Sequence, residues 1–287
     1  MLSLLSLPLL ALAPLASAQV TATGPNGPTN PSAPGFIPVG QTVNQNSDSR
    51  LISVNAIDDW CMYAPEKPQG TIGENEPTVV AWCTKPRNNA RLIPDGTIHA
   101  AQLIRTPTYI QIAGWWDGTR INIQPGDNGG ELDPHGADMK GNPVGGNVTT
   151  NLATGTDVFY EEWMMFVSYD QFCLRICTSD ENGVPTRIQC NHIYDLMGCQ
   201  WVMAIDDYWG MSKFVECEGD IAAPPGYYPQ NGWTSTWYQG QNPTPAQPAF
   251  LPKKSSCTTF STIANNVNTN DWKVTASPTY VACPPKK

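Results

Sequence analysis

The chain has 287 residues, of which only 14% are charged, and its formal net charge at pH 7 is −9. A weakly charged, acidic surface argues against nucleic acid and anionic membranes as partners. The 27 Pro and 24 Gly residues predict many turns and few long helices, while frequent Thr, Val, Ile, Tyr and Trp residues favour β structure. We therefore expect a mainly β fold, namely a disulfide-stapled β-sandwich or barrel-like domain with short helices and long loops.

Residues 1–18 have the pattern of a secretory signal peptide. An apolar run over residues 2–15, too short to span a bilayer, leads to Ala16-Ser17-Ala18, a small-x-small cleavage pattern. We expect a mature chain that begins at Gln19 and is secreted to the extracellular space or the cell wall, where disulfides persist. No later stretch is long and apolar enough to predict a transmembrane segment.

Composition divides the remaining chain into four parts. We predict a disordered Pro/Gly/Asn-rich arm at residues 19–39 and a cysteine-rich β domain at residues 40–223. A Pro/aromatic linker at residues 224–256 and a small tail bounded by a disulfide at residues 257–287 are expected to follow.

Within the predicted β domain, three segments have clear local patterns. Residues 109–116 and 119–124 alternate on either side of an Asp-Gly pair at 117–118, which predicts a two-residue β-hairpin. Residues 172–177 favour a strand. Residues 192–198 indicate one or two helical turns that end at Gly198.

Nine cysteines, an odd number, predict four disulfides and one spare thiol, and counting alone does not fix their connectivity. An alternative interpretation, a metal site formed by Cys173, Cys177 and His192, is disfavoured in an oxidising compartment. Grouping along the chain suggests a Cys61–Cys83 bridge, a Cys257–Cys283 bridge, and two bridges within a group of five cysteines that also holds the spare thiol. The group of five consists of Cys173, Cys177, Cys190, Cys199 and Cys217.

The densest polar segment runs from Gly126 to Asp138 and contains four carboxylates and one histidine among glycines. Three interpretations stay open. The first is an ordered loop whose carboxylates accept hydrogen bonds from backbone N–H groups, with no catalytic residue and no cofactor. The second is a hard cation such as Ca²⁺ held by Asp127, Glu131, Asp133 and Asp138, although the spacing does not match an EF-hand loop. The third is an enzyme in which Glu131, Asp133, His135 and Asp138 are catalytic.

Aromatic residues and one sequon suggest contact with sugars. Asn147-Val148-Thr149 is the only N-glycosylation sequon and predicts a glycosylated surface position at Asn147. Two interpretations of four tryptophans stay open: a flat face on which sugar rings stack, or core packing and docking of the linker. These residues are Trp115, Trp116, Trp233 and Trp237.

Several strings together resemble a family of fungal secreted proteins, the macrophage-activating glycoproteins, which includes a delayed-type-hypersensitivity antigen. The resemblance spans about residues 52–220 and carries no established catalytic residues. The matching strings are Trp60 to Pro65, Val80 to Lys85, Gly129 to Gly136 with Gly141-Asn142-Pro143, Phe172-Cys173, Cys190 to Tyr194, and Glu216 to Asp220.

The resemblance implies an extracellular glycoprotein of the fungal wall or secretions that is visible to host immunity. We therefore expect a non-enzymatic protein that binds surface glycans or host factors and acts as an antigen, immunomodulator or effector. Its partner would be a cell-wall polysaccharide or a host surface factor, and its oligomeric state stays open. The alternative function is that of an extracellular polysaccharide hydrolase or lyase that uses residues 127–138.

Overall fold

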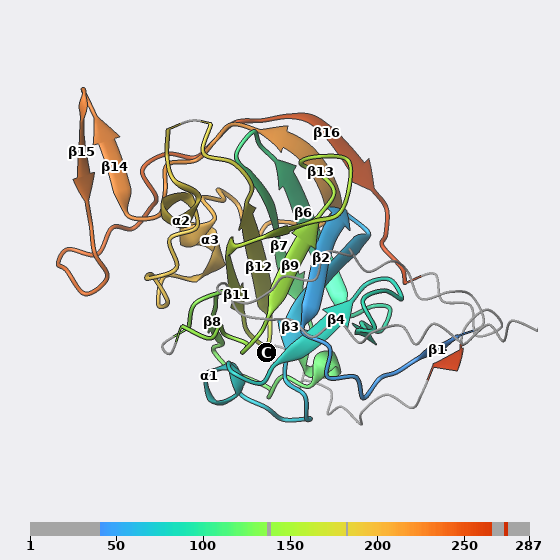
Figure 1. Cartoon of the computed structure of the whole chain (residues 1–287). Coiled ribbons are helices and arrows are strands. Elements are labelled where there is room, and N and C mark those ends of the chain that lie inside the picture. The colour runs from blue at the N-terminus through green and yellow to red at the C-terminus, as the bar shows by residue number, and fades with distance from the viewer. Residues whose placement is uncertain (1–40, 137–138, 182, 266–272, 275–287) are drawn as a thin grey trace, which may run out of the picture.

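The computed structural model describes residues 41–136, 139–181, 183–265 and 273–274, so the expected signal peptide and arm lie outside the described residues. Two β-sheets face each other (Figure 1). The six-stranded sheet has the order β10-β9-β2-β3-β4-β5. Its strands are β2 (Leu51–Ala56), β3 (Asp59–Ala64), β4 (Val80–Cys83), β5 (Arg91–Leu92), β9 (Asn147–Thr150) and β10 (Val158–Tyr160).

The seven-stranded sheet has the order β16-β13-β6-β7-β12-β11-β8. The two sheets form an open sandwich rather than a closed barrel, and the predicted mainly β, disulfide-stapled fold is confirmed. The strands of this sheet are β6 (Ile98–Arg105), β7 (Tyr109–Trp116), β8 (Gly130–Leu132), β11 (Glu162–Val167), β12 (Gln171–Cys177), β13 (Phe214–Gly219) and β16 (Lys254–Phe260).

The remaining elements are short. Two small two-stranded sheets pair β1 with β17 and β14 with β15. They and the helices have the bounds β1 (Thr42–Val43), β17 (Lys273–Val274), β14 (Tyr227–Gln230), β15 (Trp233–Thr236), α1 (Ile72–Asn75), α2 (Thr186–Gln189), α3 (Gly198–Val202) and the 3₁₀ turn η1 (Gly118–Ile121).

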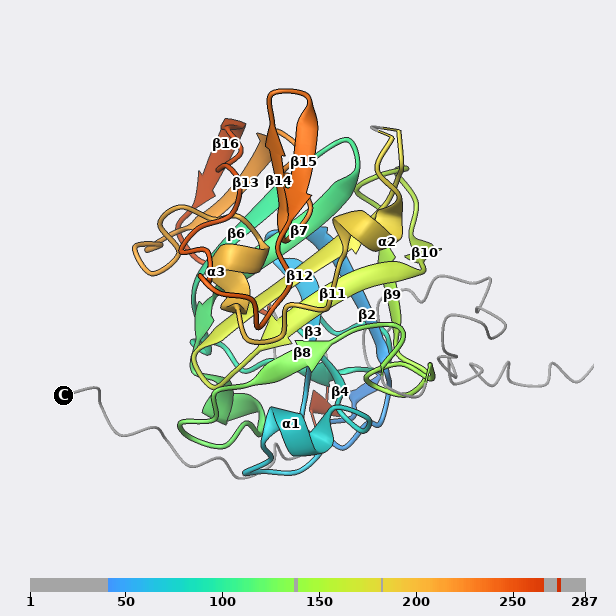
Figure 2. The same cartoon turned by 90° about the vertical axis from the view of Figure 1, so that its left-hand side faces the viewer.

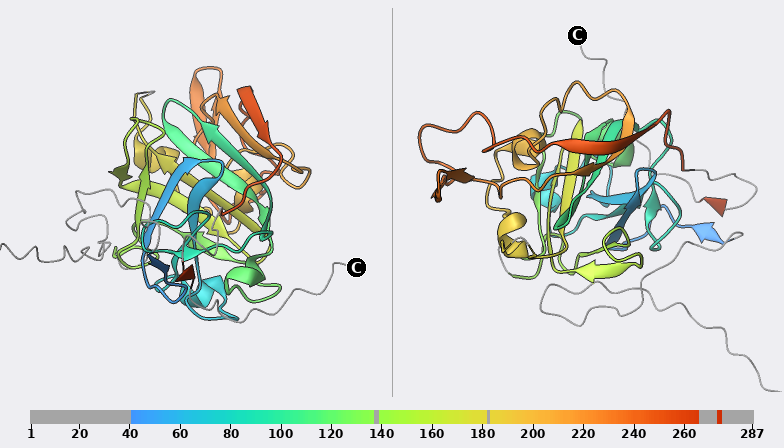
Figure 3. Two further views of the ribbon diagram at one scale, coloured as in Figure 1. Left: turned by 90° about the vertical axis from the view of Figure 1, so that its right-hand side faces the viewer. Right: turned by 90° about the horizontal axis from the view of Figure 1, so that it is seen from above.

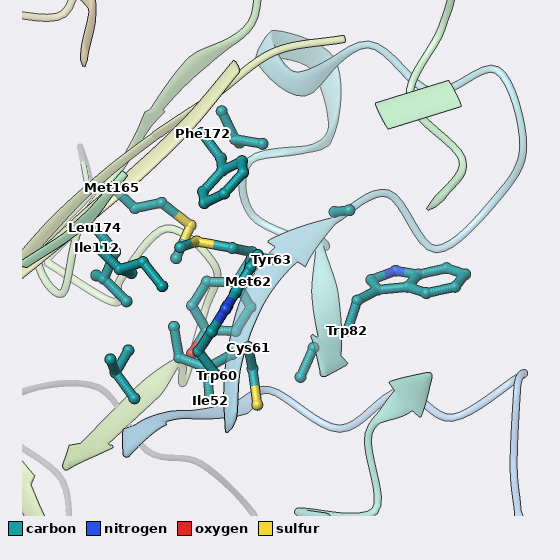
Figure 4. Close-up of a cluster of buried hydrophobic side chains, with 14 of the residues drawn as sticks. Ile52, Trp60, Cys61, Met62, Tyr63, Trp82, Ile112, Met165, Phe172 and Leu174 are labelled. Atoms are coloured by element: carbon teal, nitrogen blue, oxygen red, sulfur yellow. The ribbon is translucent and has the colours of Figure 1, made fainter. Parts of the chain in front are cut away.

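The main hydrophobic core fills the space between the two large sheets. Trp60 of β3 stacks on Phe172 of β12 with ring centroids 4.8 Å apart, which joins one sheet to the other (Figure 4). Ile112 and Leu174 lie beside this pair and are buried. Because successive side chains of a strand point to opposite faces, alternate residues of β12 enter this core.

The other residues of β12 face an outer layer that contains α2, α3 and the segment leading to residue 208 (Figure 2). Arg175 is fully buried there, and its guanidinium donates to Gln111 Oε1 at 2.8 and 3.0 Å and to the carbonyl oxygens of Gln189 and Val202. It also lies over the Tyr109 ring, 4.4 Å from the centroid. The seven-stranded sheet is therefore buried on both faces near β12, which explains why β12 is almost continuously buried.

The hairpin predicted over residues 109–124 is wrong. Strand β7 pairs instead with β6 and β12, and the chain after it turns into η1. Asp117 Oδ1 accepts a hydrogen bond from Thr119 N at 3.2 Å, so this aspartate caps a 3₁₀ turn and does not open a hairpin. The helical turns predicted to end at Gly198 are also wrong, because α3 begins at that residue.

The disulfide prediction is confirmed in part. Cys61 is bonded to Cys83, and two bridges, Cys173–Cys199 and Cys177–Cys190, lie within the group of five. The thiolate metal site is therefore wrong, because Cys173 and Cys177 are both in disulfides.

The predicted Cys257–Cys283 bridge is wrong, and so is the spare thiol within the group of five. Cys257 is bonded to Cys217, because β16 pairs antiparallel with β13 and brings the two side by side. Cys283 lies outside the described residues.

Two further segments differ from simple expectation. The Pro/aromatic segment 224–256 contains the β14–β15 hairpin, which projects from the body of the molecule (Figure 3). The surface position expected for Asn147 is wrong, because this residue of β9 is only 8% exposed and its Nδ2 is buried. A glycan on Asn147 would require that side chain to leave its position in the sheet.

Candidate metal centre

Strand β8 places two acids on one face of the seven-stranded sheet. Leu132 points into the core between the sheets, so Glu131 and Asp133 on either side of it project to the outer face. The strand is held close to β11, since a Cβ added to Gly129 would lie 2.1 Å from the Val167 carbonyl oxygen, and the φ of Gly129 is +90°. Only glycine fits at that position.

A disulfide-anchored loop, residues 190–199, brings a histidine to these acids. Cys190 and Cys199, at the two ends of the loop, are each bonded to a cysteine on the outer face of β12. The loop carries His192, whose Nδ1 lies 3.8 Å from Asp133 Oδ1. The His192 ring also stacks on that of His135, with centroids 5.3 Å apart.

Glu131, Asp133 and His192 form a group with the donor set of a metal site. One ligand atom from each of the three lies within 4.8 Å of the other two. Glu131 is 7% exposed and Asp133 3%. Asp133 Oδ1 already accepts hydrogen bonds from the backbone N–H groups of His135 and Gly136, at 2.6 and 2.7 Å. By contrast, Glu131 Oε1 is buried without a hydrogen-bond partner among the described residues.

The surroundings of the carboxyl groups at and around this site disfavour their ionised form. Burial raises the pKa of Glu131 well above its usual range, and the carboxyl group of Asp133 adds to the increase. Burial, together with the charges of Asp195 and Asp133, raises the pKa of Glu76 to about 7. Burial also raises the pKa of Asp195, while His192 acts in the opposite direction. Carboxylates concentrated in this way either retain protons or are compensated by a cation.

The donor set decides which cation fits. Two carboxylates and one imidazole suit borderline ions such as Mn²⁺ or Zn²⁺ better than Ca²⁺, which prefers oxygen ligands alone. Three protein ligands also leave coordination positions for an external group. The residues present therefore fit a divalent metal ion that keeps an open position.

The residues proposed from the sequence are distributed differently from expectation. Asp127 Oδ2 accepts a hydrogen bond from Ile72 N at the start of α1, 2.8 Å away, and is not part of the metal-binding group. His135 Nε2 lies 3.2 Å from Glu162 Oε2. Asp138 lies outside the described residues. The sequence analysis did not predict that Glu76 and Asp195 lie near the site, or that His192 lies beside the acids of the β8 segment. The one local signal for the position of His192 was that it stands between two cysteines, Cys190 and Cys199.

The four tryptophans do not share one exposed face. Trp116 is 2% exposed and donates from its Nε1 to the Ser168 carbonyl oxygen, while Trp237 is buried in the outer layer. Trp115 is partly buried and donates to the Met211 carbonyl oxygen. Only Trp233, on the β14–β15 hairpin, is well exposed, at 57%. Core packing accounts for Trp116 and Trp237.

No helix among the described residues is long and apolar enough to cross a membrane. No model of a known protein family matches the chain. No solved structure matches it significantly either.

Two curated fungal proteins are similar to the chain. Appressorium protein ROW2 of Mycosarcoma maydis is 44% identical over 225 residues, which cover 77% of this chain and 74% of ROW2. Appressorium protein ROW1 of the same fungus is 45% identical over 230 residues, or 79% of this chain and 51% of ROW1, so the chain spans about half the length of that relative. The fungal origin implied by the sequence resemblance is thus supported, and the disulfides fit an extracellular or cell-surface protein. The chain belongs to the family of fungal proteins that includes ROW1 and ROW2.

Proposed function

We propose that this protein is secreted to the fungal cell surface or wall and binds polysaccharide there through a divalent cation held by Glu131, Asp133 and His192. The relatives are named as proteins of the appressorium, an infection structure, which supports a role at the surface that meets the host. A cation with open coordination positions can take the adjacent hydroxyl groups of a sugar as ligands.

The observation that carries the proposal is the group of three ligand atoms within 4.8 Å, one of whose residues, Glu131, has a buried oxygen without a partner. An unpartnered buried carboxylate oxygen is unfavourable in a folded protein unless a ligand satisfies it. The neighbouring carboxylates of Glu76 and Asp195 increase the attraction of the site for a cation.

The surroundings of the centre suit a sugar ring. The loop that carries His192 also exposes Ile193 and Leu196. Apolar side chains beside polar ligands can cover the C–H face of a sugar while its hydroxyl groups reach the cation. An antigenic or immunomodulatory role, as the resemblance to macrophage-activating glycoproteins implies, would follow from a position at this surface, and a host surface glycan is a further candidate partner.

The test mixes the mature protein with insoluble chitin, β-glucan and isolated fungal wall, after dialysis against EDTA and then with Mn²⁺, Zn²⁺ or Ca²⁺ added. We expect depletion of protein from solution with cation and little without it. Glu131→Gln is expected to abolish the cation-dependent part, whereas Glu216→Gln, on β13 toward the other edge of the sheet, should behave as the unaltered protein. Equal depletion in EDTA and in Mn²⁺ would contradict the cation centre, and no depletion from any of the three would contradict polysaccharide binding.

The pKa of Glu131 favours a second candidate, hydrolysis or lysis of polysaccharide by acid–base chemistry. A carboxyl group whose pKa burial raises well above its usual range, beside a second carboxyl group, has the arrangement of a general acid. Soluble sugar measured in the same tubes separates the two candidates. Release that disappears in Glu131→Gln and persists in EDTA would assign the site to catalysis instead of cation-mediated binding.

A further inference from the structure

An exposed aromatic side chain lies beside the candidate metal centre, on a segment that the centre does not include. Tyr238 follows the β14–β15 hairpin and is 52% exposed. The next residue, Gln239, accepts at its Oε1 a hydrogen bond from Leu196 N at 2.8 Å. Leu196 directly follows Asp195, which lies within electrostatic reach of His192. A short path of contacts therefore connects Tyr238 with the metal centre.

The backbone on either side of Tyr238 is held by its neighbours. The carbonyl oxygen of buried Trp237 accepts a hydrogen bond from Tyr194 Oη at 2.7 Å, and the two rings stack with centroids 5.7 Å apart. Tyr238 N donates to Gln241 Oε1 at 2.9 Å. Tyr194 belongs to the 190–199 loop, whose two ends are disulfide-bonded to β12. A ligand that touches both His192 and Tyr238 therefore meets two groups on one anchored loop and its fixed neighbour, which lowers the entropic cost of binding.

The surface around the 190–199 loop is apolar and has no cationic side chain of its own. Ile193 is 46% exposed and Leu196 85%. Neither residues 190–199 nor residues 221–252 contain a lysine or an arginine, and the second range contains no charged residue at all. An anionic ligand is recognised mainly by cationic side chains, so these segments suit a neutral ligand. Apolar and aromatic side chains beside a cation match a neutral sugar chain, which has C–H faces as well as hydroxyl groups.

We propose that the metal centre and Tyr238 form one binding surface for a neutral oligosaccharide. Hydroxyl groups of one sugar bind the cation, and the ring of a following sugar stacks on Tyr238. The inference rests on the proposed function and adds to it a second subsite and a ligand of at least two sugars. Trp233 is also exposed, but it lies at the turn of the projecting hairpin and provides a control (Figure 3).

The test measures the dependence of affinity on the length of the sugar chain, by titration calorimetry with Mn²⁺ present. The probes are the monosaccharide, disaccharide and trisaccharide of β-1,3-glucan and those of chitin. We expect the trisaccharide of at least one series to bind about 10-fold more tightly than its monosaccharide, the scale of one aromatic contact. In Tyr238→Ala this gain should disappear, while the affinities for Mn²⁺ and for the monosaccharide stay unchanged.

The outcomes separate this inference from the proposed function. No gain with chain length in either series, or an undiminished gain in Tyr238→Ala, would overturn the second subsite even where cation-dependent binding to fungal wall remains. Loss of all cation-dependent binding would contradict the proposed function and this inference together.

Two further variants and one charged probe sharpen the assignment. Tyr238→Phe keeps the ring without its hydroxyl group and should retain the gain, as should Trp233→Ala. Loss of the gain in Trp233→Ala would contradict the placement at Tyr238. The trimer of galacturonic acid, at the same free Mn²⁺ concentration, should bind no more tightly than the neutral trisaccharides, and tighter binding would contradict the neutral class of ligand.

Discussion

His192 Nδ1 lies 3.8 Å from Asp133 Oδ1, although the two residues belong to segments that no local pattern connects. The contact depends on the 190–199 loop, which is covalently tied to β12 at both ends. Strand β12 is separated from β8 only by β11, so a loop fixed on β12 can reach the acids of β8. The disulfides thus build the candidate metal centre as well as stabilising the fold.

The double variant Cys177→Ser/Cys190→Ser frees one end of this loop. We expect both lower stability, by about 2–4 kcal/mol, because an unfolded chain without the bridge gains entropy, and weaker Mn²⁺ binding, by about 10-fold, because His192 loses its fixed orientation. Calorimetric titration and urea unfolding measure the two effects. The matched control is Cys217→Ser/Cys257→Ser, which removes a bridge between β13 and β16. The control should lose stability while retaining Mn²⁺ affinity, and a comparable loss of affinity in both variants would argue against the role assigned to the loop.

Replacing the imidazole by a carboxylate should change which ion is preferred. In His192→Asp the centre becomes an all-oxygen site, so we expect Zn²⁺ affinity to fall by about 10-fold or more and Ca²⁺ affinity to rise relative to it. Competition titrations of the two ions measure the ratio of affinities. His99→Asp provides the control, because His99 lies on β6 against Trp115 and not at the centre. An unchanged ratio in His192→Asp would remove His192 from the ligand set.

The carboxyl group of Glu76 makes stability depend on pH in the absence of cations. Its pKa is about 7 in the folded chain against 4.5 for an ordinary glutamate, so between these values the folded state holds a proton that the unfolded state has lost. The free energy of unfolding should therefore decrease as pH rises from about 4.5 to about 7. Thermal unfolding in EDTA across this range checks the slope. Glu76→Gln should show a shallower decrease than the unaltered protein, while Glu74→Gln, at an exposed position of the adjacent helix α1, should not.

The stack of Trp60 on Phe172 connects the two sheets at the centre of the core. Phe172→Ala removes a fully buried ring that also contacts Trp116, and should lower the free energy of unfolding by about 3–5 kcal/mol. Trp233→Ala removes a larger but exposed ring and should change it by about 0.5 kcal/mol or less. Urea denaturation of both variants tests this contrast. Similar losses in both would mean that the β14–β15 hairpin carries more of the stability than its exposure indicates.

Local patterns predicted some elements and failed at others for identifiable reasons. Strand β12 was predicted from residues 172–177, and the early pair Cys61 and Cys83 lies on paired strands, as proximity in sequence suggested. The Asp-Gly pair at 117–118 led to a wrong hairpin prediction, because a turn signal specifies that the chain bends but not which strands pair on either side of the bend. Here β7 pairs with β6 before it and β12 far beyond it.

The sequence alone therefore determined what composition and period-2 alternation carry: a mainly β, disulfide-rich fold and a cluster of acids on one short segment. Only the tertiary structure decided which acids act together. Asp127 accepts a hydrogen bond from the first residue of α1 instead. His192 lies beside Glu131 and Asp133, and the carboxyl groups of Glu76 and Asp195 are close enough to raise the pKa of Glu131. It also decided that Cys257 reaches Cys217 and that Asn147 is buried. The physical reason is that strand order and sheet packing are set by non-local burial, which no local pattern records.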